Sequence, residues 1–173
     1  MKVTAVLAAV AVSLILQLAL ARYTVGGKWL FDFVLVGVVF AALNWGPAAG
    51  MIAGSAGGLV QDMLSNDIVG TGGLAKTVIG FAAGAVGSQF VVARPAARAA
   101  LLAGASVLHR LLLLGLRGLI DQQWPVVPWG AVLGETLLNA VAGLIVFQIG
   151  ESLPGAVSRG RQSRRSGFRR REW

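Results

Sequence analysis

Six apolar stretches follow one another along the chain, and short polar, glycine-rich or proline-containing segments separate them. A helix needs about 20 predominantly apolar residues to cross roughly 30 Å of hydrocarbon, and most of these stretches come close to that length. We therefore predict an all-α fold, a polytopic membrane helix bundle of about six transmembrane helices. The predicted spans are residues 3–21, 33–43, 48–64, 74–92, 99–120 and 130–149.

Two of these spans have an alternative interpretation. The small residues at 19–21 would suit a cleaved signal peptide, but the apolar run of residues 3–21 exceeds the usual core of about 7–15 residues, so we expect a mature helix. The stretch at residues 33–43 is the shortest, and the turn at Gly46-Pro47 ends it because proline disfavours helix. A five-span bundle would place the termini on opposite sides.

Composition supports a membrane protein without a separate soluble domain. The chain is 56% hydrophobic and only 13% charged, whereas a soluble domain carries roughly 25% charged residues. We expect two regions, a transmembrane helix bundle at residues 1–150 and a basic, disordered cytoplasmic tail at residues 151–173. The absence of cysteine excludes disulfides, thiolate metal sites and cysteine nucleophiles.

The net charge of +8 arises mainly from the C-terminal tail. Because the positive charge lies beside a predicted span, we interpret it as a positive-inside signal and expect no nucleic acid partner. Both termini are then cytoplasmic, although Arg22 and Lys28 in the first outer loop argue the other way. The tail would bind anionic membrane lipid or a cytoplasmic protein partner. Its arginines are Arg159, Arg161, Arg164, Arg165, Arg169, Arg170 and Arg171.

Glycines recur at every fourth position in the third predicted span. This spacing puts them on one helix face, where another backbone can approach closely. The stripe would pack within the bundle or would bind a transmembrane helix of a partner. Its members are Gly46, Gly50, Gly54 and Gly58, and similar surfaces are formed by Gly80, Gly84 and Gly87 in the fourth span and by Gly130 and Gly134 in the sixth.

Polar residues form a second stripe, on the fifth predicted span. Ser106, Arg110, Arg117 and Asp121 share one sector of that helix, with His109 beside it, and Glu135 and Asn139 share a face of the sixth span. Ionisable groups within a span are costly, so we predict that Glu135 pairs with Arg110 or Arg117. A proton or solute path is the alternative, but the stripe covers only half of the membrane thickness. We expect His109 to be packed rather than to relay protons.

No arrangement typical of an intramembrane enzyme is present in the sequence. Asp62 and Asp67 come closest to a paired-carboxylate motif, but a spacing of five near a helix end does not put them on one face. We interpret them as residues of a helix end and a polar loop. We therefore predict that the chain is not an enzyme and binds no cofactor or metal.

The order of features between residues 32 and 84 resembles the rod shape-determining protein MreD family. Asp32 opens an apolar helix, the Gly46-Pro47 turn follows, and a glycine-rich span ends in a Gly-Leu-x-x-Asp element. Gly70 matches the loop glycine before the next helix. The positions that carry the resemblance are Asp32, Gly58, Leu59, Asp62 and Gly70.

The resemblance implies a non-catalytic subunit of the bacterial cell-elongation machinery in the cytoplasmic (inner) membrane. Such a subunit binds MreC and supports peptidoglycan synthesis by RodA and a penicillin-binding transpeptidase, alongside MreB. The family is also similar in fold to the substrate-binding subunits of energy-coupling-factor transporters. The alternative is therefore a subunit that binds a small molecule in a pocket near the outer loops. Candidate lining residues are Asp67, Asp121, Trp124 and Trp129.

Overall fold

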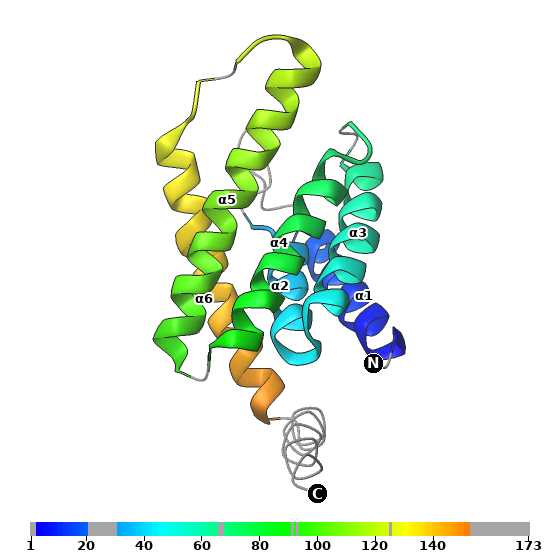
Figure 1. Cartoon of the computed structure of the whole chain (residues 1–173), viewed down its shortest axis with the longest axis vertical. Helices are drawn as coiled ribbons and strands as arrows, with labels where there is room; N and C mark the ends of the chain where they lie inside the picture. The colour runs from blue at the N-terminus through cyan, green and yellow to red at the C-terminus, as the bar shows by residue number, and fades with distance from the viewer. Residues whose placement is uncertain are drawn as a thin grey trace, which may run out of the picture.

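A computed structural model describes residues 3–20, 31–65, 68–90, 92, 94–124 and 126–152. This part of the chain forms six α-helices and no strand, so the prediction of an all-helical bundle is confirmed (Figure 1). Each helix falls on one of the predicted apolar stretches, although α1 and α4 end two and three residues before the predicted ends. The helices are α1 (Val3–Ala19), α2 (Phe33–Trp45), α3 (Pro47–Leu64), α4 (Thr71–Gln89), α5 (Pro95–Asp121) and α6 (Trp129–Ser152).

Two of the described helices are long and apolar enough to cross a membrane on their own. They are α5 and the part of α6 at Trp129–Gly150. The helices α1 and α2 are also apolar but have only 17 and 13 residues. Since a helix rises about 1.5 Å per residue, α2 is roughly 20 Å long and is too short to cross the hydrocarbon layer alone. The number of complete crossings stays a prediction.

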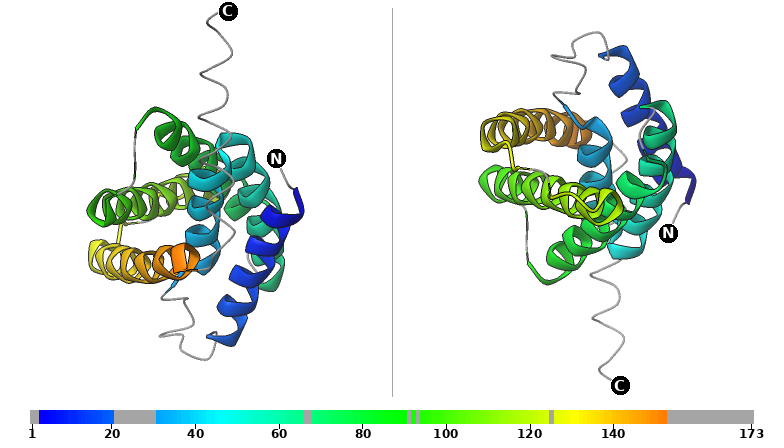
Figure 2. Two further views of the ribbon diagram at one scale, coloured as in Figure 1. Left: turned by 90° about the horizontal axis from the view of Figure 1, so that it is seen from below. Right: turned by 90° about the horizontal axis from the view of Figure 1, so that it is seen from above.

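The helix α2 lies at the centre of the bundle and contacts each of the other five helices. The helices α5 and α6 lie on one side of it and α1 and α3 on the other, while α4 lies between α3 and α5 and packs against both (Figure 2). Successive helices run in opposite directions, so the first turn of α1 and the last turn of α6 lie at the same end of the bundle (Figure 1). The α5–α6 hairpin extends beyond the other helices at the opposite end.

Two apolar clusters hold α2 in this position. Val34 and Val38 of α2 pack against Val6 and Val10 of α1 and against alanines of α3. The opposite face of α2 packs against α4, α5 and α6, with Phe147 at its edge. Because both faces are buried, α2 has no polar side, which explains why its sequence is almost uniformly apolar.

The α3 and α4 helices pack with their backbones in contact. A Cβ atom added to Gly50 would collide with the backbone of Gly80, and one added to Gly80 would collide with the backbone of Gly50. Gly54 and Gly58 meet the α4 backbone in the same way. These three α3 glycines therefore pack within the bundle, as one of the two interpretations of the stripe expected.

The fourth member of the stripe has a different role. Gly46 joins α2 to α3 with φ at +94°, a left-handed backbone region that favours glycine, and a Cβ there would meet no described atom within 4 Å. In α4, Gly84 and Gly87 contact the α2–α3 corner. A Cβ on Gly130 or Gly134 would likewise meet no described atom within 4 Å, so intramolecular packing is wrong for these two glycines.

Candidate functional site

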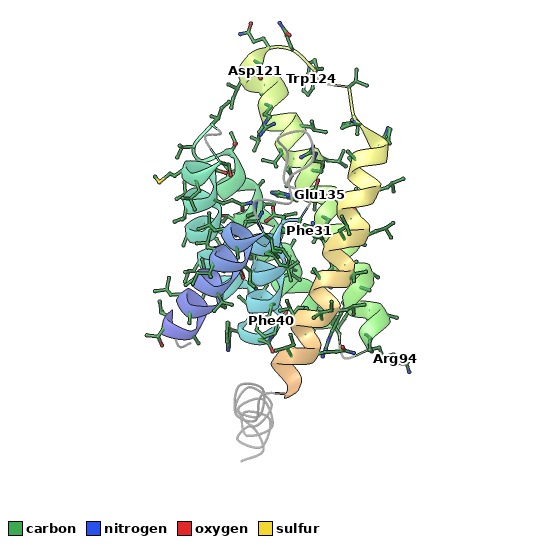
Figure 3. All side chains as sticks on the ribbon, turned by 180° about the vertical axis from the view of Figure 1, so that it is seen from behind. Phe31, Phe40, Arg94, Asp121, Trp124 and Glu135 are labelled. Atoms are coloured by element: carbon green, nitrogen blue, oxygen red, sulfur yellow. The ribbon has the colours of Figure 1, made fainter. Side chains whose placement is uncertain are left out.

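The most polar part of the described interior surrounds the N-terminus of α2. This helix begins inside the bundle, and Phe31, just before it, lies about halfway along α6 (Figure 3). The first amide groups of a helix have no partner within the helix and must find one elsewhere. At membrane depth such groups are tolerated only where other protein groups satisfy them.

Side chains from three elements satisfy these amides. The Asp32 carboxylate caps α2 by accepting from the Leu35 amide at 2.9 Å. The Phe33 amide donates to Gln17 Oε1 of α1 at 2.8 Å, and the Asp32 amide donates to Asn139 Oδ1 of α6 at 2.9 Å. The buried start of α2 therefore depends on α1 and α6 as well as on its own cap.

The same aspartate forms a buried ion pair. Lys76 Nζ of α4 lies 2.8 Å from Asp32 Oδ2, and both side chains are less than a tenth exposed. His109 of α5 lies beside the pair, with Nε2 3.1 Å from Lys76 Nζ and Nδ1 3.8 Å from Asp32 Oδ2. Asn139 completes the group by donating to Ser106 Oγ at 3.1 Å.

We refer to Asp32, Lys76, Ser106, His109 and Asn139 as the polar cluster. Its members come from α2, α4, α5 and α6. An ammonium group can only donate, so the contact with Lys76 assigns the lone pair to Nε2 of His109 and the proton to Nδ1. The opposite charges of the ion pair compensate each other, whereas Nδ1 of His109 has no hydrogen-bond partner among the described residues. The cluster therefore connects four helices through the Asp32–Lys76 ion pair and the hydrogen bonds around it.

Sequence reasoning found only part of this cluster. The sequence predicts that Asp32 opens a helix and that His109 is packed. In the structure Asp32 is the N-cap of α2 and His109 is buried. Lys76 was missed, although a lysine inside the predicted span at residues 74–92 is a signal in itself, because such a charge needs a partner. The partners could not be identified because helix order in space is not a local property of the sequence.

Asp62 has a more specific role than the end of a helix or a polar loop. Its side chain is buried, and Oδ2 accepts from the amides of Gly70, Gly72 and Gly73 at 2.9, 3.0 and 3.2 Å. These groups begin α4, which has no side-chain cap of its own at Gly70. Asp62 thus lies in the last turn of α3, as expected for a residue at a helix end, and in addition it supplies the cap of α4. Asp67 lies outside the described residues.

The remaining positions of the resemblance lie in the same α3–α4 joint. Gly58 meets the backbone of Gly73, and the Leu59 side chain also lies against Gly73. Gly70 has φ at +103°, a backbone conformation that L side chains rarely adopt, and this turn brings its amide to Asp62. The five positions thus lie at two joints, the α3–α4 contact and the start of α2.

The predicted intramembrane pair is present between α5 and α6. Arg110 Nη1 lies 3.8 Å from Glu135 Oε2, and both side chains are mostly buried. Arg117 lies two turns further along the same face of α5. Ser106, Arg110 and Arg117 thus form a polar stripe on α5. The stripe runs from the polar cluster toward the α5–α6 connection.

A cavity of about 610 Å³ opens beside this stripe. Two of the four candidate lining residues, Asp121 and Trp124, border it, whereas Trp129 does not and Asp67 lies outside the described residues. Figure 3 shows Asp121 and Trp124 at the end of the bundle opposite Arg94. The cavity is lined by Arg110, Leu114, Arg117, Asp121, Gln123, Trp124, Val126 and Pro128.

Several other predictions fall outside the described residues. They concern Arg22, Lys28 and the tail at residues 151–173, of which only the helical backbone of residues 151 and 152 is described. Among the described residues, no three His, Cys, Asp or Glu side chains come together in a group that could hold a metal ion. The tail arginines concerned are Arg159, Arg161, Arg164, Arg165, Arg169, Arg170 and Arg171.

No family model, curated protein or solved structure matches this chain.

Proposed function

We propose that the chain is a non-catalytic integral membrane subunit of the bacterial cell-elongation machinery, of the MreD type. It would bind MreC and support peptidoglycan synthesis by RodA and a penicillin-binding transpeptidase, alongside MreB. The observation that carries this proposal is that the positions responsible for the resemblance all hold helices in place. Asp32 and Asp62 cap helices, while Gly58 and Gly70 allow the close α3–α4 contact. These are requirements of a rigid membrane scaffold, which needs no reactive group.

The charge distribution supports the same proposal. Asp32 and Glu135 are engaged by Lys76 and Arg110, and Asp62 is engaged by backbone amides. These carboxylates are thus used to hold helices together. A scaffold subunit in the inner membrane, with multiple spans and both ends in the cytoplasm, also agrees with α1 beginning and α6 ending at one end of the bundle (Figure 1).

The surface offered to a partner helix is an apolar groove of about 500 Å³ between α4 and α5. Alanines and Gly104 form much of its floor, and small residues let a foreign backbone approach closely in lipid, where packing rather than hydrophobic force drives association. We propose that the single transmembrane helix of MreC occupies this groove.

Co-purification of the full chain from bacterial membranes tests the proposal. Recovery of a coiled-coil, single-span protein together with the chain supports the scaffold function. Recovery of a pair of ATPases instead would support the transporter alternative and would contradict the scaffold. The read-out is the identity of the recovered proteins, so it does not depend on any activity of the chain.

One observation favours the second candidate, a substrate-binding subunit of a small-molecule transporter. The cavity beside α5 has a volume within the range of ligand pockets, roughly 300–1,000 Å³, and Trp124 and Asp121 border it. The same observation is compatible with a scaffold that holds a lipid. We therefore keep the scaffold as the main proposal.

A further inference from the structure

The cavity beside α5 is built from the last turns of that helix and the connection to α6. The connection folds back toward the helix, because a Cβ on Gly118 would lie 2.9 Å from the indole ring of Trp124. Trp124 and Val126 are nevertheless 74% and 92% exposed. Exposed tryptophan and valine at one end of an apolar hairpin are typical of the membrane–water interface, so the cavity opens at that level.

One wall of the cavity presents an arginine with unused hydrogen-bonding capacity. The 3.8 Å between Arg110 Nη1 and Glu135 Oε2 is longer than a charge-assisted hydrogen bond, which measures about 2.7–2.9 Å. A guanidinium carries five N–H donors. Arg110 Nε is buried and has no hydrogen-bond partner among the described residues. Glu135 therefore pairs with the charge of Arg110 but leaves hydrogen-bond donors of this side chain unused.

A second guanidinium lines the same cavity. Arg117 follows Arg110 by seven residues, which is about 10 Å along the helix and close to two full turns, so both lie on one face. The carboxylate on the wall is Asp121, which is exposed at the end of α5, where water screens it more strongly than the half-buried arginines. Two guanidinium groups therefore line the part of the cavity that lies deeper in the bundle than Asp121.

We propose that this cavity binds an anionic phosphate group, with Arg110 and Arg117 as its ligands. Planar guanidinium groups suit phosphate oxygens because they can donate two parallel hydrogen bonds. The phosphate would belong to the headgroup of an anionic membrane lipid or to a soluble anion on the same side of the membrane. This inference is independent of the cell-elongation proposal, since it concerns a ligand of the chain itself.

Fluorescence of Trp124 provides a local test. The full chain is placed in bilayer discs that contain phosphatidylcholine with a fraction of brominated lipid, either brominated phosphatidylglycerol or brominated phosphatidylcholine. Bromine quenches a nearby indole, and the Trp124→Phe variant shows which part of the signal comes from this residue. We expect the brominated phosphatidylglycerol to quench Trp124 more strongly, because both lipids carry a phosphate but only one has a net negative charge.

Two variants connect this preference to the arginines. Arg117→Gln should reduce the preference for the anionic lipid about fivefold, the factor expected for one arginine at an anionic surface. The double variant Arg110→Gln with Glu135→Gln removes the ion pair without leaving a charge unpaired, so the bundle should still fold, and it should weaken the preference similarly. Arg94→Gln is the matched control, because it removes the same charge at the other end of α5 (Figure 3).

The source of the phosphate is resolved by adding inorganic phosphate. If it abolishes the lipid preference, the site takes a soluble anion; if the preference persists, the site takes a lipid headgroup. Equal quenching by both brominated lipids, with no effect of inorganic phosphate on Trp124, would overturn the proposal. So would a preference that survives unchanged in both arginine variants.

Discussion

Lys76 and Asp32 form the buried charge pair on which the centre of the bundle depends. Their distance of 2.8 Å and their burial mean that neither charge can be compensated by water. Removing one partner of a buried pair costs about 3–5 kcal/mol, because the other charge is left uncompensated. Replacing both partners by neutral residues costs much less, since no charge remains to be buried.

We therefore predict that Lys76→Met lowers the free energy of unfolding by about 3–5 kcal/mol. The double variant Lys76→Met with Asp32→Asn should recover most of this loss, because asparagine can still cap α2. Unfolding of the purified protein in mixed detergent micelles gives both values. If Lys76→Met alone were as stable as the unchanged chain, the ion pair would contribute nothing to the bundle.

At Asp62 a carboxylate replaces the missing side-chain cap of α4. It accepts three amide hydrogen bonds and lies at the positive end of the helix dipole. Asp62→Asn removes the charge and one acceptor oxygen, so we expect a loss of about 1–2 kcal/mol in the same unfolding assay. Asp121→Asn, the same chemical change at an exposed carboxylate, should change stability by less than about 0.5 kcal/mol. Equal effects at the two positions would argue against the cap.

Among the elements, α3 and α4 pack with their backbones in direct contact. We predict that Gly50→Ala destabilises the protein by about 1–3 kcal/mol, because the added methyl collides with the backbone of Gly80, which cannot move without the whole helix. Gly134→Ala on α6 adds the same methyl in open space and should be neutral or stabilising by up to about 1 kcal/mol. Thermal unfolding of both variants in detergent measures the difference. A larger loss at Gly134 would contradict the packing described here.

The elements themselves were largely predictable from the sequence. Apolar runs and their interruption by residues such as Pro47 and Pro95 are local signals, so all six helices fall on predicted stretches. The second stretch is visibly short in the sequence, but the reason why a short helix is stable there is not local. The helix α2 begins inside the bundle, where Gln17 and Asn139 complete its hydrogen bonds.

The candidate site was less predictable, because it is formed by contacts between distant segments. Asp32 and Asn139 are 107 positions apart, and Lys76 and His109 are 33 apart. The pairing of Arg110 with Glu135 could be predicted because a connection of a few residues makes α5 and α6 antiparallel neighbours. The connection between α4 and α5 is equally short and makes these two helices neighbours as well, but nothing comparable identifies α4 as the neighbour of α2. Helix position, rather than residue type, limited the prediction.

For the molecule as a whole, the apolar groove between α4 and α5 gives the scaffold proposal a testable surface. Gly104 lines this groove, and a Cβ on it would meet no described atom within 4 Å. A leucine at this position would fill the space that a partner helix needs without disturbing contacts of the bundle. We therefore predict that Gly104→Leu reduces the recovery of MreC in co-purification at least tenfold, the loss that about 1.4 kcal/mol of binding energy produces.

Gly115→Leu is the matched control, because it adds the same side chain to the same helix outside the groove, also where a Cβ meets no described atom. Both variants should unfold at the same detergent concentration as the unchanged chain, so a change in recovery reports on binding rather than on folding. If both variants retain MreC, the partner binds another face. If both lose it equally, the whole outer surface of α5 contributes, because a groove restricted to α4 and α5 would spare the control position.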